Sequence, residues 1–427
     1  MFRAENAQSL SGLALTLVVC WVLSEDRRRF PWRLAAGAIF LQAALVVVLF
    51  GLPGARSVLA GVNGVVDALA EATAQGTRFV FGYMGGGAQP YEVSEPSALF
   101  VFAFQVLPLI LVISALSALL WHWRILRWVT QAFGFLFQRT MGLGGASALA
   151  VAANIFLGMV ESPIVIRAYL DRLTRSELFL MMVVGLATVA GSTMVAYATI
   201  LKPVLQNAAA HVLVASIVSA PAGVLLARIM VPEKPGQKPA GGDYGALLKY
   251  DSSIDAISRG TMDGLSVVLN ISAILIVFVA LVALANSALG VLPEVAGAPL
   301  SVERILGEIF APLAWSLGID WQDARTAGYL LGVKLMLTEF IAFIQLGATP
   351  AAEMSERTRM IMTYALCGFA NVGSVGITVS GIGVLMPERR GEIISLVWKA
   401  LLAGFLATCM TAAIVGAMPA ELFSRAG

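Results

Sequence analysis

Two glutamates inside apolar segments carry the clearest chemical signal in this sequence. Glu161 follows a short apolar run and has a glycine and a proline close by, and Glu339 lies within a second apolar run. A charge in the hydrocarbon region of a bilayer costs at least about 2.5–3.5 kcal/mol, so such a residue is a candidate for function. A carboxylate has two acceptor oxygens and no proton to donate, which suits a vicinal diol such as the 2′ and 3′ hydroxyls of a ribose. The alternative is that Glu161 and Glu339 form ion pairs with Arg167 and Lys334.

A third polar cluster lies in a glycine-containing apolar segment near the C-terminus. Asn371 and Ser374 are three residues apart, so they share one face of a helix. Gly368 and Gly373 flank Asn371, which favours local unwinding of that helix. The two side chains would then offer neutral donors and acceptors to a solute. The alternative is that they hydrogen-bond neighbouring helices.

A fourth segment, residues 185–193, is rich in small and hydroxyl-bearing residues. If the helix unwinds here, backbone carbonyls and the hydroxyl of Thr188 become available to a cation. Na⁺ is a hard ion that takes oxygen ligands, and Asn154 offers one more oxygen. The alternative is a face of small residues for helix packing.

The composition of the chain requires a lipid bilayer as its partner. Of the 427 residues, 59% are hydrophobic and only 13% are charged, and the mean hydropathy is +0.85. Soluble domains have about 45–50% apolar and about 25% charged residues. The formal net charge of +2 is too small to indicate nucleic-acid binding. The three cysteines lie far apart in apolar runs and are predicted to be buried thiols, outside any disulfide or metal site.

Eight apolar stretches of about 20 residues are long enough to cross a bilayer as helices. The first is followed by Arg27, Arg28 and Arg29, and basic residues concentrate on the cytoplasmic side. This pattern predicts a multi-pass protein of the bacterial inner membrane with both termini in the periplasm. Residues 54–98 are only moderately apolar and are predicted to form interfacial helices. The eight predicted spans cover residues 8–23, 34–53, 99–121, 177–201, 207–229, 264–290, 359–386 and 391–417.

Two segments, 141–172 and 322–350, are apolar but interrupted by glycine, proline and charged residues. They occupy matching places in the two halves of the chain, which indicates inverted repeats around a binding site at mid-membrane. We expect re-entrant helical hairpins here; the alternative is a pair of distorted full spans. The expected fold class is therefore an all-α polytopic membrane protein with eight transmembrane helices, two re-entrant hairpins and interfacial helices.

This fold class suggests three parts of the chain. Residues 1–121 are expected to hold N-terminal spans and interfacial helices of a scaffold. Residues 122–262 are expected to hold the first hairpin and the spans that follow it. Residues 263–427 are expected to hold a long scaffold helix, the second hairpin and the last two spans.

In their order and spacing, these clusters resemble the concentrative nucleoside transporter family, and the resemblance extends over almost the whole chain. The run from Tyr364 to Asn371 is its most specific piece, and the segments 30–33 (Phe-Pro-Trp-Arg) and 104–108 (Phe-Gln-Val-Leu-Pro) also fit the family pattern. The resemblance implies a homotrimer in which a transport part, made of the hairpins and broken helices, moves like an elevator against a trimeric scaffold.

The resemblance also implies roles for individual residues. The implied ribose ligands are Glu161, Glu339, Asn371 and Ser374, the implied neighbours of the base are Thr193 and Phe369, and the implied Na⁺ ligands are the side chains of Asn154 and Thr188 and the carbonyls of Leu157 and Val189.

The sequence departs from the family pattern in the segment that reads the base. Met159 and Val160 stand where the family usually has Gln and Thr or Ser, and neither side chain can pair with the edge of a base. A missing hydrogen-bond partner costs roughly 1–3 kcal/mol in a site built for it. We therefore expect a more apolar base pocket here. Thr338 and Ser147 replace an Asn and a Glu that are frequent in the family.

Together these observations predict a secondary active symporter that imports nucleosides or nucleoside-like solutes, driven by a sodium gradient and without a cofactor. Coupling to protons through Glu161 or Glu339 is the alternative, and the solute would then be a nucleoside or another hydroxylated metabolite. A passive channel fits less well, because broken hairpins with central glutamates favour a closed binding site. An enzyme is not expected, because the histidines, His122 and His211, form no metal-binding motif and the sequence has no ATP-binding motif.

Overall fold

The computed structural model of the chain describes residues 4–92, 99–159, 161–234, 236, 249–295, 297–350, 352–419 and 421–424. Within these residues the fold is all-helical, apart from an isolated β-bridge between Val295 and Ala298. The helices of the first half are α1 (Ala4–Val22), α2 (Trp32–Gly51), α3 (Pro53–Phe81), η1 (Gly82–Gly85), α4 (Phe102–Gln105), α5 (Pro108–His122), α6 (Ile125–Met141), α7 (Gly145–Asn154), α8 (Glu161–Val165), η3 (Arg167–Arg172), α9 (Arg175–Ala187), α10 (Gly191–Leu201) and α11 (Ala208–Met230). Those of the second half are α12 (Ser253–Leu289), α13 (Val302–Ser316), α14 (Trp321–Met336), α15 (Glu339–Ala348), α16 (Glu356–Leu366), α17 (Val372–Leu385), η4 (Pro387–Arg389), α18 (Arg390–Ala417) and α19 (Glu421–Ser424).

Six helical segments of the described residues are long and apolar enough to cross a membrane. They are Trp32–Gly51, Phe102–His122, Arg175–Leu201, Ala208–Met230, Ser253–Leu289 and Pro387–Ala417. Each coincides with one of the predicted spans. The first predicted span, 8–23, lies almost wholly in α1, and the seventh, 359–386, is shared between α16 and α17. The predicted multi-pass all-α class is therefore confirmed.

Two of the predicted spans are broken where the sequence indicated unwinding. Between α9 and α10 the chain leaves the helix at Thr188–Ala190, and between α16 and α17 it leaves the helix from Cys367 to Asn371. Asn371 then begins α17 as its N-cap, because its Oδ1 accepts a hydrogen bond from the backbone N–H of Ser374 at 2.8 Å. A helix break at this depth exposes backbone polar groups, which must find partners inside the protein.

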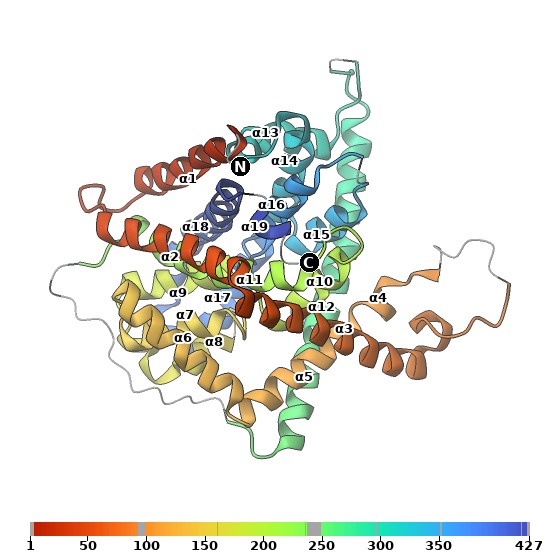
Figure 1. Cartoon of the computed structure of the whole chain (residues 1–427), viewed down its shortest axis with the longest axis horizontal. Coiled ribbons are helices and arrows are strands. Elements are labelled where there is room, and N and C mark those ends of the chain that lie inside the picture. Colours follow the sequence, from red (N-terminus) through yellow and green to blue (C-terminus); the bar gives the residue numbers. More distant parts are fainter. Residues whose placement is uncertain are drawn as a thin grey trace.

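The two halves of the chain repeat one order of elements (Figure 1). α5, α6, a hairpin, a broken helix and α11 make up the first series, and α12, α13, a hairpin, a broken helix and α18 make up the second. Corresponding elements pack alike: α6 lies on α7 as α13 lies on α14. The counterparts α5 and α12 also contact each other, as do α11 and α18. This order matches the repeats expected from the paired broken segments.

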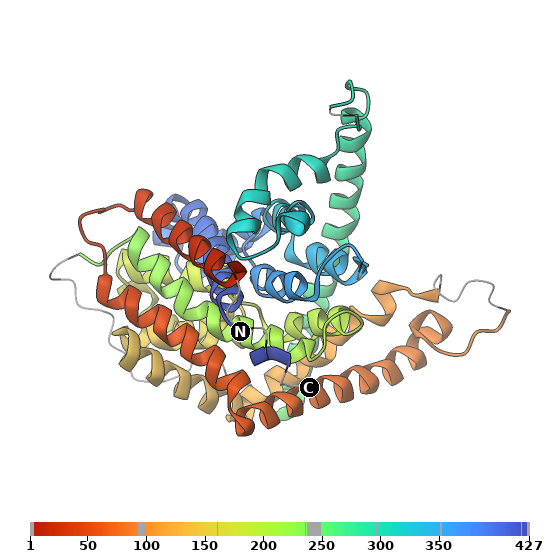
Figure 2. The same cartoon turned by 45° about the horizontal axis from the view of Figure 1, so that its top comes forward.

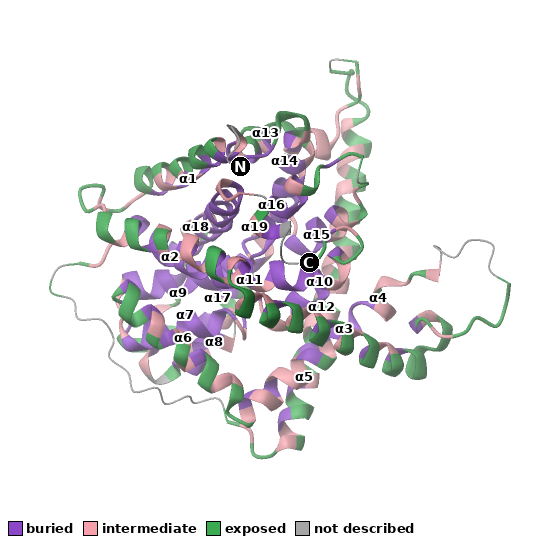
Figure 3. Cartoon of the chain, in the orientation of Figure 1, coloured by how far each residue is buried: buried purple, intermediate pink, exposed green. Residues whose placement is uncertain are grey.

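The burial pattern separates an inner group of helices from an outer one (Figure 3). α9 and α11 are almost wholly buried, and so is the most apolar stretch of α18. α1 packs along α18, and α2 packs along α11. By contrast, none of the most apolar 18-residue stretch of α12 is buried. α3 extends away from the helical bundle, and α12 runs along its edge (Figures 1 and 2). α1 and α2 therefore pack against the inner helices.

α12 is longer than the sequence suggested. It begins at Ser253, eleven residues before the predicted 264, because the Ser252 hydroxyl caps it by accepting from the N–H of Asp255 at 3.1 Å. Its 37 residues make it about 55 Å long, well beyond a hydrocarbon core of about 30 Å. The boundary drawn between residues 262 and 263 thus falls inside this helix. Residues 235 and 237–248, which precede it, lie outside the described residues.

Candidate functional site

Each hairpin places its glutamate at the same structural position. α7 ends at Asn154 and α8 begins at Glu161; α14 ends at Met336 and α15 begins at Glu339. Each glutamate is thus the first residue of the second helix of its hairpin. The first tip depends on Gly158, whose φ of +100° suits glycine. A Cβ added there would lie 3.0 Å from the Cβ of Ala190 and 3.1 Å from Oε2 of Glu161.

Both carboxylate oxygens of Glu339 accept hydrogen bonds from side chains. Glu339 is buried, with 4% of its surface exposed. Its Oε2 accepts a hydrogen bond from Nδ2 of Asn371 at 2.7 Å. Its Oε1 accepts from the hydroxyl of Tyr197 at 2.9 Å. Because Oδ1 of Asn371 accepts from the Ser374 N–H, the structure brings together three of the four predicted ribose ligands. Thr338, which caps α15, donates to Oε2 of Glu339 at 3.3 Å.

Lys334 does not neutralise Glu339 by an ion pair. The ammonium of Lys334 is fully buried and donates to the carbonyl of Ala365 at 2.7 Å and to the hydroxyl of Thr408 at 2.6 Å. It therefore satisfies a carbonyl at the end of α16, next to the second helix break. The alternative interpretation of Glu339 as a structural ion-pair partner of Lys334 is wrong for the described residues.

Tyr197 was not among the predicted site residues, although it contacts Glu339 directly. It is fully buried in α10, with its ring stacked on Phe343 at a centroid distance of 4.4 Å. A signal for it exists in the sequence: Tyr197 lies four residues after Thr193, so the two share a helix face. Thr193 itself is 5% exposed, in the first turn of α10.

Glu161 lines a small polar cavity between the first hairpin and two outer helices. The cavity has a volume of about 60 Å³, far below the ~300 Å³ of a small-molecule pocket. Its walls come from α5, α12, the hairpin and the start of α10, with Tyr250 from the segment before α12. The lining residues are Ser114, Ser117, Ala118, Trp121, Phe156, Leu157, Glu161, Ser192, Tyr250, Gly260 and Asp263.

The base-reading segment is only partly described. Met159 lies beside α17, where its sulfur accepts a contact from the hydroxyl of Thr378 at 3.8 Å. Thr378 is one turn after Ser374 and also donates to the Ser374 carbonyl at 2.7 Å. Met159 therefore lies close to the helix that carries a predicted ribose ligand. Val160 lies outside the described residues.

Two of the four predicted cation ligands, Asn154 and Thr188, are in contact where the first hairpin touches the first helix break. The hydroxyl of Thr188 donates to the carbonyls of Val184 at 2.8 Å and Asn154 at 3.2 Å. Leu157 lies in the turn after Asn154, and Val189 lies in the break. These four residues offer oxygen atoms, the ligands that a hard ion such as Na⁺ prefers. Among the described residues, no group of three or more His, Cys, Asp and Glu side chains could hold a metal ion.

The Asn154 side chain is the notable feature of this junction. Asn154 is 1% exposed, and within the described part of the chain neither Oδ1 nor Nδ2 has a hydrogen-bond partner. Leaving a buried amide unsatisfied costs about 1–3 kcal/mol per group. A buried amide normally has a polar partner, either a water or a ligand. Its oxygen and the hydroxyl of Thr188 are ligand types that a hard cation accepts.

Backbone hydrogen bonds tie this junction to the second helix break. The N–H of Phe369 donates to the carbonyl of Thr188 at 3.3 Å, and the N–H of Asn371 donates to the carbonyl of Phe369 at 2.9 Å. On the hairpin side, the N–H of Gly191 donates to the carbonyl of Phe156 at 3.0 Å. The hairpin tip and both breaks therefore form one connected unit.

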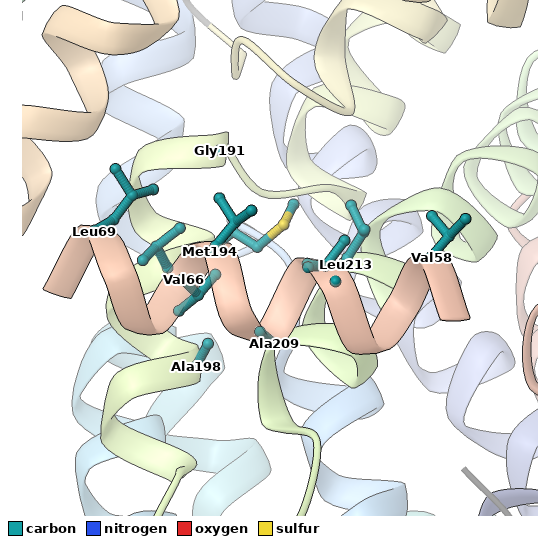
Figure 4. Close-up of a pocket in the computed structure, with 12 residues that line it drawn as sticks. Val58, Val66, Leu69, Gly191, Met194, Ala198, Ala209 and Leu213 are labelled. Atoms are coloured by element: carbon teal, nitrogen blue, oxygen red, sulfur yellow. The ribbon is translucent and has the colours of Figure 1, made fainter. Parts of the chain in front are cut away.

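A larger groove lies elsewhere and is lined by apolar residues (Figure 4). It has a volume of about 440 Å³ and runs between α3, α10 and α11. Gly191 lies on its wall, but none of the predicted ligands of the ribose or of Na⁺ does. Although this groove is larger than the cavity at Glu161, its apolar lining does not suit a polar solute.

Paired hairpins and broken helices whose polar groups meet inside an all-helical membrane protein define the architecture of a secondary transporter. Comparison with known proteins narrows this class. Three family descriptions match consecutive parts of the chain: "Na+ dependent nucleoside transporter N-terminus" at residues 11–84, "Nucleoside recognition" at 103–204 and "Na+ dependent nucleoside transporter C-terminus" at 211–416. The chain belongs to the concentrative nucleoside transporter family, and it is a nucleoside transporter and not an enzyme.

Relatives from distant organisms align with nearly the whole chain. The nucleoside permease NupC of Helicobacter pylori is 35% identical over 413 residues, which is 96% of both chains. Human solute carrier family 28 member 3 is 32% identical over 431 residues, which is 96% of this chain and 59% of the carrier.

Solved structures of a similar transporter, CNTnw, have the same fold. An inward-facing, substrate-bound state is 34% identical, with a TM-score of 0.87 and 97% of both chains covered. An outward-facing state of a variant is 33% identical with a TM-score of 0.88, over 99% of this chain and 98% of the other. An intermediate state of another variant has a TM-score of 0.87 at 34% identity, over 96% of this chain and 98% of the other.

Proposed function

We propose that this protein is a sodium-driven symporter that imports nucleosides across the bacterial inner membrane. The observation that carries the proposal is the buried amide of Asn154, whose oxygen has no partner among the described residues. The hydroxyl of Thr188 donates to the backbone carbonyl of the same residue at 3.2 Å. A buried amide and a hydroxyl at a helix break form an oxygen site for a monovalent cation. The family description, which includes sodium dependence, supports this assignment.

The ribose is proposed to bind to Glu339, Asn371 and Ser374 from one side and to Glu161 from the other. Three of these residues already form one hydrogen-bonded group. Oε2 of Glu339 accepts hydrogen bonds from Asn371 and Thr338. Oε1 accepts one, from Tyr197, and has a further lone pair for a substrate hydroxyl. Thr193, Phe369, Met159 and Val160 are proposed to surround the base.

Na⁺ is proposed to bind to the side chains of Asn154 and Thr188 and to the carbonyls of Leu157 and Val189. In this role Na⁺ is a co-substrate that travels with the nucleoside. The Thr188 carbonyl accepts from Phe369, and Phe369 accepts from Asn371. Through these bonds, cation binding at Thr188 in the first break would also stabilise the second break, which presents Asn371 to the ribose.

The transport cycle is proposed to be of the elevator type. The cavity at Glu161, about 60 Å³, is too small for a nucleoside, so the first hairpin must separate from α5 and α12 to admit one. The inward-facing, outward-facing and intermediate states of CNTnw support such a movement. α1 and α2 pack on α18 and α11, so we assign them to the moving part.

Three copies are proposed to assemble through the outer helices. α12 is apolar and, within one chain, none of its most apolar stretch is buried, so it faces either lipid or another chain. Gly260 and Gly264 hold α12 close to α5, since a Cβ at Gly260 would lie 2.7 Å from the Ser114 carbonyl oxygen. α5 and α12 thus form a rigid pair suited to a scaffold.

The arginines at 27–29 support a cytoplasmic first loop and periplasmic termini.

Uptake of uridine into proteoliposomes tests this proposal. With purified full-length protein, we expect saturable uptake that an inward Na⁺ gradient stimulates at least ten-fold over choline and that a proton gradient leaves unchanged. Asn154→Ala is expected to raise the half-saturating Na⁺ concentration at least ten-fold. Asn63→Ala is the matched control, because Asn63 hydrogen-bonds Asn207 away from the junction.

Two results would contradict this function. Unaltered Na⁺ dependence in Asn154→Ala would remove the proposed ion site, and uptake that follows the proton gradient would favour the proton-coupled alternative. Glu339→Gln tests the substrate assignment separately, since this variant is expected to lose nucleoside binding while keeping the fold.

A further inference from the structure

Glu339 accepts a hydrogen bond from a residue on a different helix, and the proposed transport cycle gives that residue no role. The hydroxyl of Tyr197, on α10, donates to Oε1 of Glu339 at 2.9 Å, while Asn371 holds Oε2. Tyr197 is 142 residues away in the sequence and fully buried. The two donors approach different oxygens of one carboxylate, so they fix both the position and the plane of the group.

The ring of Tyr197 is anchored on the hairpin helix that begins with Glu339. It stacks on Phe343 with ring centroids 4.4 Å apart and meets Phe340 edge-on at 5.3 Å. These ring contacts do not involve the hydroxyl. The packing of the ring and the hydrogen bond of the hydroxyl can therefore be separated by exchanging tyrosine for phenylalanine.

We propose that Tyr197 is a positioning residue that orients the Glu339 carboxylate for the sugar hydroxyls of the substrate. This inference rests on the proposed role of Glu339. Without the phenol, Oε1 loses a charge-assisted hydrogen bond in a buried environment, and the carboxylate is no longer fixed in one plane. The substrate-side lone pairs then lose their fixed direction. Only ligands that use those lone pairs should bind more weakly.

Equilibrium binding to the purified full chain at saturating Na⁺ tests this role, with uridine and 2′,3′-dideoxyuridine as ligands. Tyr197→Phe is expected to weaken uridine binding roughly ten-fold, the effect of one hydrogen bond to a charged group. It should weaken binding of dideoxyuridine less than two-fold. In a Glu339→Gln background, the added Tyr197→Phe should cause no further loss of uridine affinity.

Tyr364→Phe is a matched control. Tyr364 is also fully buried, and its hydroxyl lies 3.0 Å from Nδ1 of His211, so this variant loses a comparable buried hydrogen bond. It should leave the affinities for both ligands within two-fold, and thermal melts should show both variants folded.

The outcomes separate the two proposals. If Glu339→Gln weakens uridine binding but Tyr197→Phe does not, or if Tyr197→Phe weakens both ligands equally, the positioning role is overturned. If Glu339→Gln itself leaves uridine binding intact, the proposed substrate site is overturned.

Discussion

The backbone N–H of Phe369 donates to the carbonyl of Thr188 at 3.3 Å and so joins the two helix breaks. Thr188 lies in the proposed sodium site, and Phe369 is two residues before Asn371, which holds Glu339. A few bonds therefore connect the place where a cation would bind with the place where a sugar would bind. Because the protein interior is closely packed, ordering one break by a cation also favours order in the other.

The contact between the breaks leaves no room for a side chain at Gly368. A Cβ there would lie 2.6 Å from Cγ2 of Thr408 and 2.9 Å from the carbonyl oxygen of Ala187. Gly368→Ala is expected to destabilise the protein by about 1–3 kcal/mol through overpacking and to lower nucleoside uptake. Thermal unfolding in detergent and uptake assays measure both effects.

Gly376→Ala is the control for this prediction. A Cβ at Gly376, on α17, meets nothing within 4 Å. This variant should retain wild-type stability and uptake. Equal behaviour of the two alanine variants would show that the breaks tolerate separation.

The buried Lys334 is predicted to have a structural role. Lys334→Met leaves the Ala365 carbonyl and the Thr408 hydroxyl without their ammonium partner, which should cost about 1–3 kcal/mol of unfolding free energy. In the Thr408→Val background the loss should be smaller, since one of the two acceptors is then absent. The four unfolding transitions of this double-mutant cycle provide the measurement. Strict additivity would argue against the Lys334–Thr408 hydrogen bond.

Met159 is predicted to make recognition of the base permissive. A thioether offers no donor and only a weak acceptor, so the base contributes to binding chiefly through apolar contact. Met159→Gln should raise the affinity for uridine relative to that for the base-free 1-O-methyl riboside by up to about ten-fold, the effect of one added hydrogen bond.

Met159→Leu is the control, because it keeps the apolar contact and adds no donor. Competition against labelled uridine measures these ratios. If glutamine and leucine at position 159 give the same ratio, Met159 does not contact the base.

The loop between α1 and α2 is predicted to confer a small pH-dependent stability. A hydrogen bond from Arg175 lowers the pKa of Glu25, and Lys399 adds to the effect. Since the pKa of Glu25 is lower in the folded state than its unfolded value of about 4.3, ionised Glu25 stabilises the protein above that pH. The stabilisation is lost as the pH falls through the folded-state pKa.

Glu25→Gln should therefore lower the melting temperature slightly at pH 7 and have little effect near pH 3. The side chain of Glu25 is about one-third exposed, so the free energy involved is below about 1 kcal/mol and decreases with added salt. Glu71→Gln, which breaks a more exposed pair with Arg78, should show no such difference. A loss of stability in Glu25→Gln that is constant between pH 3 and pH 7 would contradict the role of its charge.

Several features of this protein could be predicted from local sequence. The breaks at Thr188 and at Cys367–Asn371 occur within the glycine-containing segments that predicted them, and the two glutamates follow the hairpin turns. The reason is that a bilayer offers no hydrogen bonds, so each span must satisfy its own backbone. The length of an apolar run and the place where it is interrupted are therefore set by the local sequence. The early start of α12 was also encoded locally, in the cap formed by Ser252 and Asp255, although the predicted span began only at residue 264.

Other features were decided only by the tertiary structure. The sequence placed Lys334 near Glu339 and left an ion pair open as the alternative, yet Lys334 binds the end of α16 and Glu339 binds Tyr197. These partners lie 31 and 142 residues apart in the chain. Which buried donor meets which acceptor depends on how whole helices pack against one another, and helix packing has no local signature. The sequence by itself therefore determined where polar groups enter the membrane, and only the packed fold decided which of them pair.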